Sequence, residues 1–309
     1  MPRRCLTLAA VLFPLAAILL PLAAHGAQDT VDRDAVRRGE YVFRAAGCAG
    51  CHTDVKDEKT PLAGGRALRT PFGTFYGPNI TPDPDYGIGG WALEDFTRAL
   101  REGLSPDGGY YFPALPYTSY SGMADDDIAD LWAYLQTVAP SSRARREHDL
   151  DFPYGMRWLL GPWRYLYFQP VPFDADLPAP AAVESPGVWR RGAYLVRALA
   201  HCGECHTPRG SLGARDGDRE LAGNAQGPDG DPAPNITPHN PTGIGVWSAD
   251  DIVFYLEIGM KPDGDFADGA MAGVIEHSTG TLSGDDRQAI AAYLLSLPPV
   301  DRKIDMPKR

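Results

Sequence analysis

The chain has 309 residues, with 29 basic and 40 acidic side chains and a formal net charge of −11 at pH 7. This acidic balance argues against a nucleic-acid-binding protein, because such proteins contact phosphate through basic surfaces. It favours a protein partner with a basic docking face, although the charge could also serve only to keep the protein in solution. The length allows two compact domains.

The first 26 residues have the pattern of a secretory signal peptide. Arg3 and Arg4 form a basic start, an apolar run covers residues 6–22, and the small residues Ala24, Gly26 and Ala27 offer a cleavage site. Two prolines interrupt the apolar run and disfavour a stable membrane-spanning helix. An uncleaved segment that anchors the protein in the membrane is therefore the weaker alternative to a cleaved signal peptide. We therefore predict a periplasmic protein, either free or at the periplasmic face of the inner membrane.

A five-residue motif occurs twice in the chain. Cys48-Ala49-Gly50-Cys51-His52 and Cys202-Gly203-Glu204-Cys205-His206 both read C-x-x-C-H, which is the attachment motif of c-type haem. In such a motif two thiols become thioethers on the porphyrin, and the histidine becomes an axial ligand of the iron. We therefore predict two covalently bound haem c groups, with attachment residues Cys48, Cys51, Cys202 and Cys205 and proximal ligands His52 and His206.

Two other uses of paired cysteines fit less well. A thioredoxin-like C-x-x-C needs a βαβ setting, and no such pattern surrounds either motif. A zinc site built from C-x-x-C pairs brings the pairs much closer in sequence. The fifth cysteine, Cys5, lies in the predicted signal peptide, so the mature chain keeps no thiol for a disulfide framework.

Helical periodicity predicts the same elements around both motifs. Apolar residues three and four positions apart indicate, in chain order, helices at 31–46, just after Trp91, at about 128–138, at 189–199, after Ser248, and after Ser283. Ser248 and Ser283 are expected N-caps, and Pro140 and Pro298 should end the closing helices. Little of the chain reads as strand, so we predict an all-α fold with long Gly/Pro-rich loops that pack on the porphyrin.

Further sequence signals repeat in the same order. Pro78-Asn79-Ile80-Thr81-Pro82 returns as Pro234-Asn235-Ile236-Thr237-Pro238, and a Gly-Ile-Gly segment followed by a tryptophan also occurs in both places. An ordered match of this length indicates duplicated domains. The expected boundaries are a signal peptide at 1–26, a first domain at 27–145, a connector at 146–185, a second domain at 186–300 and a short basic tail at 301–309.

The connector is dense in proline and aromatic residues and does not resemble a flexible tether. The favoured interpretation is that its apolar residues pack between the two domains and fix their orientation. The alternative is a surface patch for a membrane or a partner subunit. The residues concerned are Met156, Trp158, Leu159, Leu160, Trp163, Tyr165, Leu166, Tyr167 and Phe168.

The sixth iron ligand is expected to be methionine, whose soft thioether favours ferrous iron. Met123 is the only methionine between the first motif and its closing helix, whereas Met260 and Met271 compete after the second. We predict Met123 and Met271, because both lie shortly before a closing helix. The alternative ligands are His148 and His277.

A ligating imidazole needs a fixed acceptor for its other N–H. The stiff proline loop supplies a carbonyl in each repeat, so we expect His52 to donate to Pro78 and His206 to Pro234. Other side chains near these loops are expected to line the haem or bind a propionate, with a solvated surface role as the alternative for the arginines: Trp91, Trp247, and Arg66 or Arg69.

With these motifs the sequence resembles class I cytochromes c, and more narrowly the multihaem cytochrome c subunits of bacterial membrane-bound alcohol, aldehyde and gluconate dehydrogenases. The resemblance covers about residues 33–300. Besides the two C-x-x-C-H units, it rests on Gly77-Pro78-Asn79-Ile80, Gly87-Ile88-Gly89-Gly90-Trp91 and Tyr111-Phe112-Pro113-Ala114-Leu115-Pro116-Tyr117. It implies two tandem class I cytochrome c domains, each wrapped around a covalently attached haem. The chain departs from the best-known members in having two haem motifs rather than three, and Leu115 stands where some relatives have methionine.

The resemblance implies an exported electron carrier that is not an enzyme by itself. Its partners would be a dehydrogenase catalytic subunit as donor and quinone or a terminal acceptor downstream. Association with the membrane is possible, and the acidic charge argues against nucleic acid as a partner. The alternatives are a dihaem peroxidase-like enzyme or a haem sensor, each with one open iron site.

Overall fold

The computed structural model describes residues 32–306 except 55, 58 and 171–177. The predicted signal peptide, Cys5, part of the connector and the last three residues of the predicted tail lie outside the described residues. We call residues 32–145 the N-terminal segment and residues 186–306 the C-terminal segment. By their contacts the residues after Val31 form one unit, so a boundary between two domains stays a prediction.

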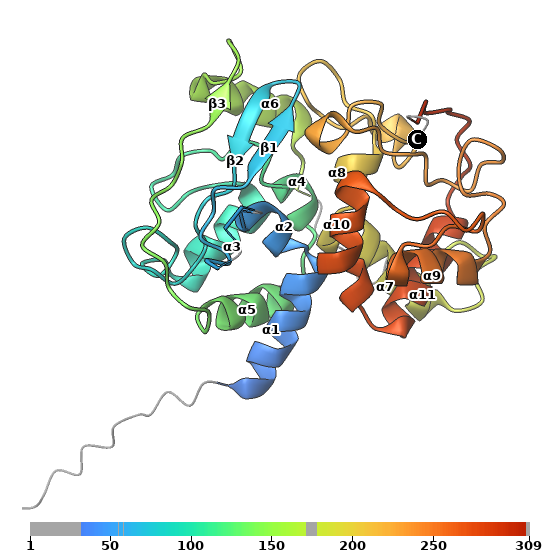
Figure 1. Cartoon of the computed structure of the whole chain (residues 1–309), viewed down its shortest axis with the longest axis horizontal. Helices are drawn as coiled ribbons and strands as arrows, with labels where there is room; N and C mark the ends of the chain where they lie inside the picture. The colour runs from blue at the N-terminus through green and yellow to red at the C-terminus, as the bar shows by residue number, and fades with distance from the viewer. Residues whose placement is uncertain (1–31, 55, 58, 171–177, 307–309) are drawn as a thin grey trace, which may run out of the picture. The chain divides into compact units, whose positions relative to one another are not determined.

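Two crossing helices frame the N-terminal segment. α1 (Arg33–Ala45) packs on α5 (Asp125–Leu135), as Figure 1 shows. α1 begins at Asp32, whose carboxylate accepts hydrogen bonds from two amides of the first turn. Arg38 and Asp130 join the two helices through an ion pair of 2.6 Å. The shorter helices between them are α2 (Cys48–His52), α3 (Leu93–Glu102) and α4 (Tyr117–Tyr120).

The C-terminal segment has a corresponding pair. α7 (Pro186–Tyr194) packs on α11 (Gly284–Leu295), and Arg191 and Asp286 form an ion pair of 2.7 Å between them. α7 continues into a π-helical turn, η2, which leads to the second motif. The other elements are η2 (Leu195–Leu199), α8 (Gly203–His206), η3 (Gly217–Arg219), η4 (Pro228–Gly230), α9 (Ala249–Ile258), α10 (Gly269–His277) and η5 (Thr279–Thr281).

The caps predicted from the sequence are confirmed. Ser248 and Asp251 form a reciprocal capping box at the start of α9, and the Ser283 hydroxyl accepts from the amide of Asp286 at the start of α11. α5 and α11 end at Leu135 and Leu295, a few residues before Pro140 and Pro298. These boundaries follow from local chemistry, which is why the sequence predicts them.

The all-α prediction is wrong in one region, because the chain also forms a small antiparallel sheet. β1 (Ala67–Thr70) pairs with β2 (Gly73–Tyr76), and β2 pairs with β3 (Asp149–Leu150). The hairpin turn at Pro71-Phe72 between two short β-prone runs is the signal that could have indicated it. β1 also contacts η4, where Arg66 and Asp229 form an ion pair of 3.2 Å.

Some side chains of the connector pack against the rest of the protein, and others are exposed to solvent. The described helical elements of the connector are η1 (Arg157–Leu159) and α6 (Leu160–Tyr167). Leu160 is buried against Phe75 and Phe112, and the Trp163 indole donates to the carbonyl of Leu212 in the C-terminal segment. Four other apolar side chains are exposed: Trp158, Tyr165, Leu166 and Tyr167. The connector therefore packs in part, and the favoured prediction of full packing is wrong for these four residues.

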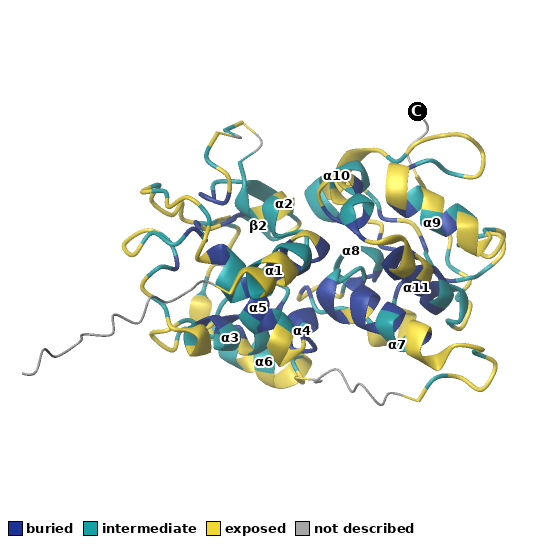
Figure 2. Cartoon of the chain, turned by 90° about the horizontal axis from the view of Figure 1, so that it is seen from below, coloured by how far each residue is buried: buried dark blue, intermediate teal, exposed yellow. Residues whose placement is uncertain are grey.

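The largest apolar core contains buried side chains from both segments. Its members come mainly from α1, α3, α5, α7, η2, α9 and α11 (Figure 2). Hydrogen bonds also join the segments, including one of 2.6 Å from the Tyr41 hydroxyl in α1 to Asp286 in α11. Among the described residues, no helix combines the length and hydropathy that a membrane span requires.

Candidate haem-attachment site

Both C-x-x-C-H motifs form a single short helical turn. In α2 and α8 this turn places the two cysteines and the histidine of each motif close together, and none of the four thiols is in a disulfide. Burial raises the pKa of Cys48 to about 12 and that of Cys202 to about 11, so both are neutral thiols at physiological pH. Each motif therefore presents two free thiols, as thioether formation requires.

The two motif histidines make the hydrogen bonds predicted from the sequence. His52 Nδ1 lies 2.8 Å from the carbonyl oxygen of Pro78, and His206 Nδ1 lies 2.8 Å from that of Pro234. A carbonyl can only accept, so Nδ1 carries the proton and Nε2 keeps its lone pair for a metal. Burial lowers the pKa of both imidazoles, against the opposing effect of the carbonyl bond, and so favours the neutral form that ligates iron.

A buried asparagine holds each proline loop against a later part of the chain. Asn79 Nδ2 donates to the carbonyls of Ser141 and Arg143, at 2.7 and 3.1 Å. Asn235 Nδ2 donates in the same way to the carbonyls of Val300 and Arg302, at 2.8 and 3.3 Å. We call the two stretches that cross the loops, residues 141–143 and 300–302, the straps.

Sequence reasoning did not find the straps. The end predicted for the second domain, at residue 300, separates Val300 from Arg302, although the carbonyls of both residues accept hydrogen bonds from Asn235. The repeated Pro-Asn-Ile-Thr-Pro signal marks one partner of each contact, and the straps share only a short Pro-x-x-Arg pattern, from Pro140 to Arg143 and from Pro299 to Arg302. The first two residues of the predicted tail therefore belong to the fold around the second motif.

The predicted methionines both contact the large core. Met123 is 2% exposed and precedes α5, and its carbonyl accepts from Arg101. Met271 is half-buried near the start of α10 and packs on the same core. Met260 instead lies in an isolated bridge with Phe266, where the N-terminal segment has Leu104 bridged to Tyr110. Ligation by Met123 and Met271 stays a prediction.

The structure gives other roles to several alternative residues. His148 accepts from the backbone amide of Tyr76 and contacts the rings of Phe75 and Phe112, so it belongs to the small sheet. His277 lies at the end of α10 with about half of its side chain exposed. Arg66 and Arg69 both reach Asp229 of η4, at 3.2 and 4.0 Å. Trp91 and Trp247 are half-buried against the core.

A carboxylate within the second motif is a feature that sequence reasoning missed. Glu204 is almost fully buried, and it contacts Ser119 of α4 as well as Arg209 and Arg215. Burial alone would raise its pKa, but the two guanidinium groups and the Ser119 hydroxyl hold it at about 2. The carboxylate is therefore charged at every physiological pH.

The residues present fit a covalently attached haem. Four free thiols sit beside two imidazoles whose Nε2 atoms are available, and methionine thioethers lie in the adjoining core. This donor set combines the covalent attachment points with the axial ligand types of c-type haem.

Comparison with known proteins agrees with this geometry. The cytochrome c family model matches residues 36–139. The chain is 48% identical over 268 residues to a diheme cytochrome c-type protein of Cereibacter sphaeroides, a match that covers 85% of this chain and 86% of that protein.

The chain is also similar to cytochrome subunits of dehydrogenases. It is 42% identical to the cytochrome c subunit of an alcohol dehydrogenase (quinone) of Gluconobacter oxydans, covering 90% of this chain and 57% of that subunit. It is 43% identical to the gluconate 2-dehydrogenase cytochrome c subunit of Pantoea cypripedii, covering 89% and 62%. The chain thus spans about three fifths of these two relatives. With the family model, the diheme relative and the two histidine–carbonyl pairs in agreement, the chain belongs to the cytochrome c family, whose members carry covalently bound haem c in electron transport.

Proposed function

We propose that this protein is an exported carrier with two covalently bound haem c groups. It receives electrons from the catalytic subunit of a periplasmic dehydrogenase and passes them toward quinone or a terminal acceptor. Similarity to the cytochrome subunits of alcohol and gluconate dehydrogenases supports the choice of donor. The second C-x-x-C-H motif and the name of the diheme relative support the count of two.

The chain's own residues would hold each haem in one orientation. Cys48 and Cys51 would carry the first group and Cys202 and Cys205 the second, each through two thioether bonds. Bound haem supplies one-electron iron chemistry, which the side chains alone do not provide. His52 and His206 would ligate through Nε2, because Pro78 and Pro234 hold the proton on Nδ1.

The distal ligands we propose are Met123 and Met271. A thioether in the core favours ferrous iron and gives a high reduction potential, as an electron carrier needs. The burial of Met123 at 2% supports this role, because a buried thioether excludes water and other ligands from the iron. Filled axial positions at both irons would leave no open site for peroxidase or sensor chemistry.

The observation that carries the proposal is the matching geometry of His52 and His206. The same Nδ1-to-carbonyl distance of 2.8 Å occurs beside each C-x-x-C-H turn. A histidine that only packed in the core would not need its Nδ1 fixed on a carbonyl beside a pair of free thiols, and this arrangement occurs at both motifs.

The test is to count and remove the haems one at a time. The protein is expressed with the haem-attachment machinery, recovered from the periplasm, and compared with the variants C48S/C51S and C202S/C205S by intact mass and pyridine haemochrome spectra. We expect two covalent haems in the wild type and one in each variant. We also expect both wild-type haems to be low-spin and unaffected by carbon monoxide.

Three results would contradict the proposal. A wild-type protein with fewer than two haems would remove the dihaem assignment. Carbon monoxide binding at one iron would remove Met123 or Met271 as its ligand and favour a peroxidase or sensor. Failure of a purified dehydrogenase catalytic subunit to reduce the dihaem protein would remove that subunit as the donor.

A further inference from the structure

The two haem motifs differ at their third position. Gly50 in the first motif is exposed, and a side chain added there would meet no atom within 4 Å. Glu204 occupies the corresponding position of the second motif, and its side chain is only 10% exposed. A buried carboxylate is costly unless it is fully paired, so its presence in one motif alone calls for a physical reason.

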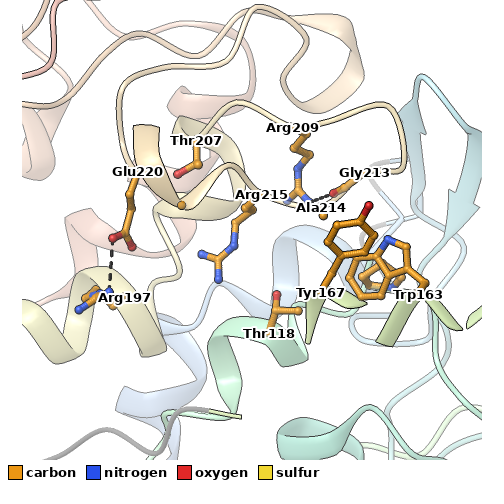
Figure 3. Close-up of a pocket in the computed structure, with 12 residues that line it drawn as sticks. Thr118, Trp163, Tyr167, Arg197, Thr207, Arg209, Gly213, Ala214, Arg215 and Glu220 are labelled. Carbon is orange, nitrogen blue, oxygen red and sulfur yellow. Dashed lines mark hydrogen bonds and ion pairs between the residues drawn. The ribbon is translucent and has the colours of Figure 1, made fainter. Parts of the chain in front are cut away.

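The Glu204 carboxylate is paired on both oxygens. Oε1 accepts from the Ser119 and Thr118 hydroxyls, at 2.7 and 2.9 Å, and Oε2 accepts from Arg209 at 2.5 Å. The Arg215 guanidinium lies 3.6 Å from Oε1. Arg209 and Arg215 follow α8 in the chain and, with Thr118, line a cavity of about 290 Å³. Figure 3 shows these three side chains.

The same α4 that contacts Glu204 also reaches the first motif. The Tyr120 hydroxyl donates to the carbonyl of Ala46, two residues before Cys48, at 3.2 Å. His201, directly before Cys202, contacts that carbonyl through Nε2 at 3.2 Å, and its ring lies 5.4 Å from that of Tyr120. α4 therefore joins the residues just before both motifs, and Glu204 is the carboxylate at this junction.

The local charge is fixed by these contacts. One carboxylate faces two guanidinium groups, and all three side chains are at most 26% exposed. Charges held away from bulk water act more strongly on a neighbour than exposed charges do. Because Glu204 directly precedes Cys205 in the chain, its charge lies beside the attachment point of the second haem.

We propose that Glu204 is a positioning residue that sets the reduction potential of the haem attached to Cys202 and Cys205. Its carboxylate holds α4 at the junction of the two motifs and offsets the positive charge of Arg209 and Arg215. This inference rests on the proposed dihaem function and goes beyond it, because it assigns the potential of one haem to a side chain that the first motif lacks. A negative charge near the iron favours the ferric state, so Glu204 lowers the potential of that haem.

The test is an optical redox titration of the full dihaem protein and three variants. Glu204→Gln removes the charge and keeps the shape, so we expect one of the two potentials to rise. The expected size is up to about a tenfold change in the reduction equilibrium constant, or about 59 mV for one electron. Arg209→Gln removes a positive charge from the same site and should move the same potential down. Glu147→Gln is the matched control: it removes a carboxylate whose side chain is 82% exposed, so solvent screens its charge and we expect less than about a threefold change at either haem.

The signs of the shifts decide the proposal. Opposite shifts of one haem in Glu204→Gln and Arg209→Gln support it, whereas shifts of the same sign show general disruption and overturn it. Unchanged potentials with two haems attached also overturn it. If Glu204→Gln loses the second haem, Arg209→Gln decides alone: a lowered potential supports the proposal, and an unchanged or raised one overturns it. Intact mass distinguishes a failure of this inference from a failure of the proposed function, since a haem missing from the wild type contradicts the dihaem function itself.

Discussion

At the residue scale, the carbonyl that fixes each motif histidine depends on the asparagine that follows it. Asn79 Oδ1 accepts from both the amide and the hydroxyl of Thr81, at 2.9 and 2.8 Å, while its Nδ2 binds the strap. A single side chain thus satisfies polar groups from two separate parts of the chain. Because the residue is 4% exposed, water does not replace these bonds when they are lost.

We expect Asn79→Ala to lower the free energy of unfolding by roughly 2–4 kcal/mol, since it leaves several buried groups without a partner. Asn235→Ala should have a similar effect in the C-terminal segment, because Asn235 makes corresponding bonds to Thr237 and to its own strap. Urea unfolding of the haem-loaded protein, followed by far-UV circular dichroism, measures both losses.

Gln136→Ala serves as the control for these substitutions, because it removes an exposed amide side chain at the end of α5. Its effect should stay within about 0.5 kcal/mol. Equal midpoints for Asn79→Ala and Gln136→Ala would show that the strap contact does not stabilise the fold.

At the element scale, a glycine permits each of the two main helix crossings. A Cβ atom built on Gly39 of α1 would lie 1.9 Å from the carbonyl oxygen of Asp130 in α5. A Cβ atom on Gly192 of α7 would lie 1.9 Å from the carbonyl oxygen of Ala289 in α11. Because both obstacles are backbone atoms, the helices can accept a methyl group only by moving apart.

We therefore expect Gly39→Ala and Gly192→Ala each to destabilise the protein by about 1–3 kcal/mol or more, as overpacking does. This outcome opposes helix propensity, which by itself favours alanine over glycine by about 1 kcal/mol. Thermal unfolding monitored at 222 nm measures the sign and the size.

Gly187→Ala is the matched control, because this α7 residue is exposed and an added Cβ would meet nothing within 4 Å. Alanine there should be neutral or slightly stabilising. If Gly192→Ala were as well tolerated as Gly187→Ala, close approach of the helix backbones would not be the reason for glycine at the crossing.

At the scale of the whole molecule, features encoded locally could be predicted from the sequence. The Ser248 and Ser283 caps and the spacing of the apolar residues are local signals, and the structure has the corresponding helices. The His52–Pro78 bond was predictable because the imidazole needs an acceptor and the stiff loop offers one.

Features that depend on distant partners could not be predicted in the same way. β3 consists of only two residues, and its pairing with β2 across more than seventy positions leaves no periodic trace. The straps and the contacts of Glu204 also join residues far apart in the chain. The exposure of Trp158 and Tyr165 could not be predicted either, since the sequence of an aromatic segment does not show whether its side chains are buried or exposed.

The contact between the two segments offers a test at this largest scale. Asp286 in α11 accepts from the Tyr41 hydroxyl of α1 at 2.6 Å and from Arg191 of α7 at 2.8 and 2.7 Å. Burial by itself would raise the pKa of Asp286, but the bonds from Arg191 and Tyr41 outweigh it, and the net effect is a lowered pKa. A lowered native pKa means that the ionised carboxylate stabilises the fold above the ordinary value of 3.8, and that this contribution is lost as the pH falls through the native value.

We expect Asp286→Asn to lower stability at pH 7 by roughly 1–3 kcal/mol, because Arg191 is partly solvated and the pair is correspondingly weakened. The gap between variant and wild type should narrow as the pH falls below 3.8 and through the lowered native pKa, where the folded wild-type carboxylate also becomes protonated. Thermal midpoints at pH 7 and at the lowest pH that keeps the protein folded measure this convergence.

Tyr41→Phe separates the two contacts, since it removes the bond between the segments but keeps the Arg191 pair. It should therefore lower stability at pH 7 by less than Asp286→Asn does, and it should retain most of the acid dependence. An Asp286→Asn deficit that stayed constant with pH would mean that the side chain acts through packing, and that its charge does not hold the segments together.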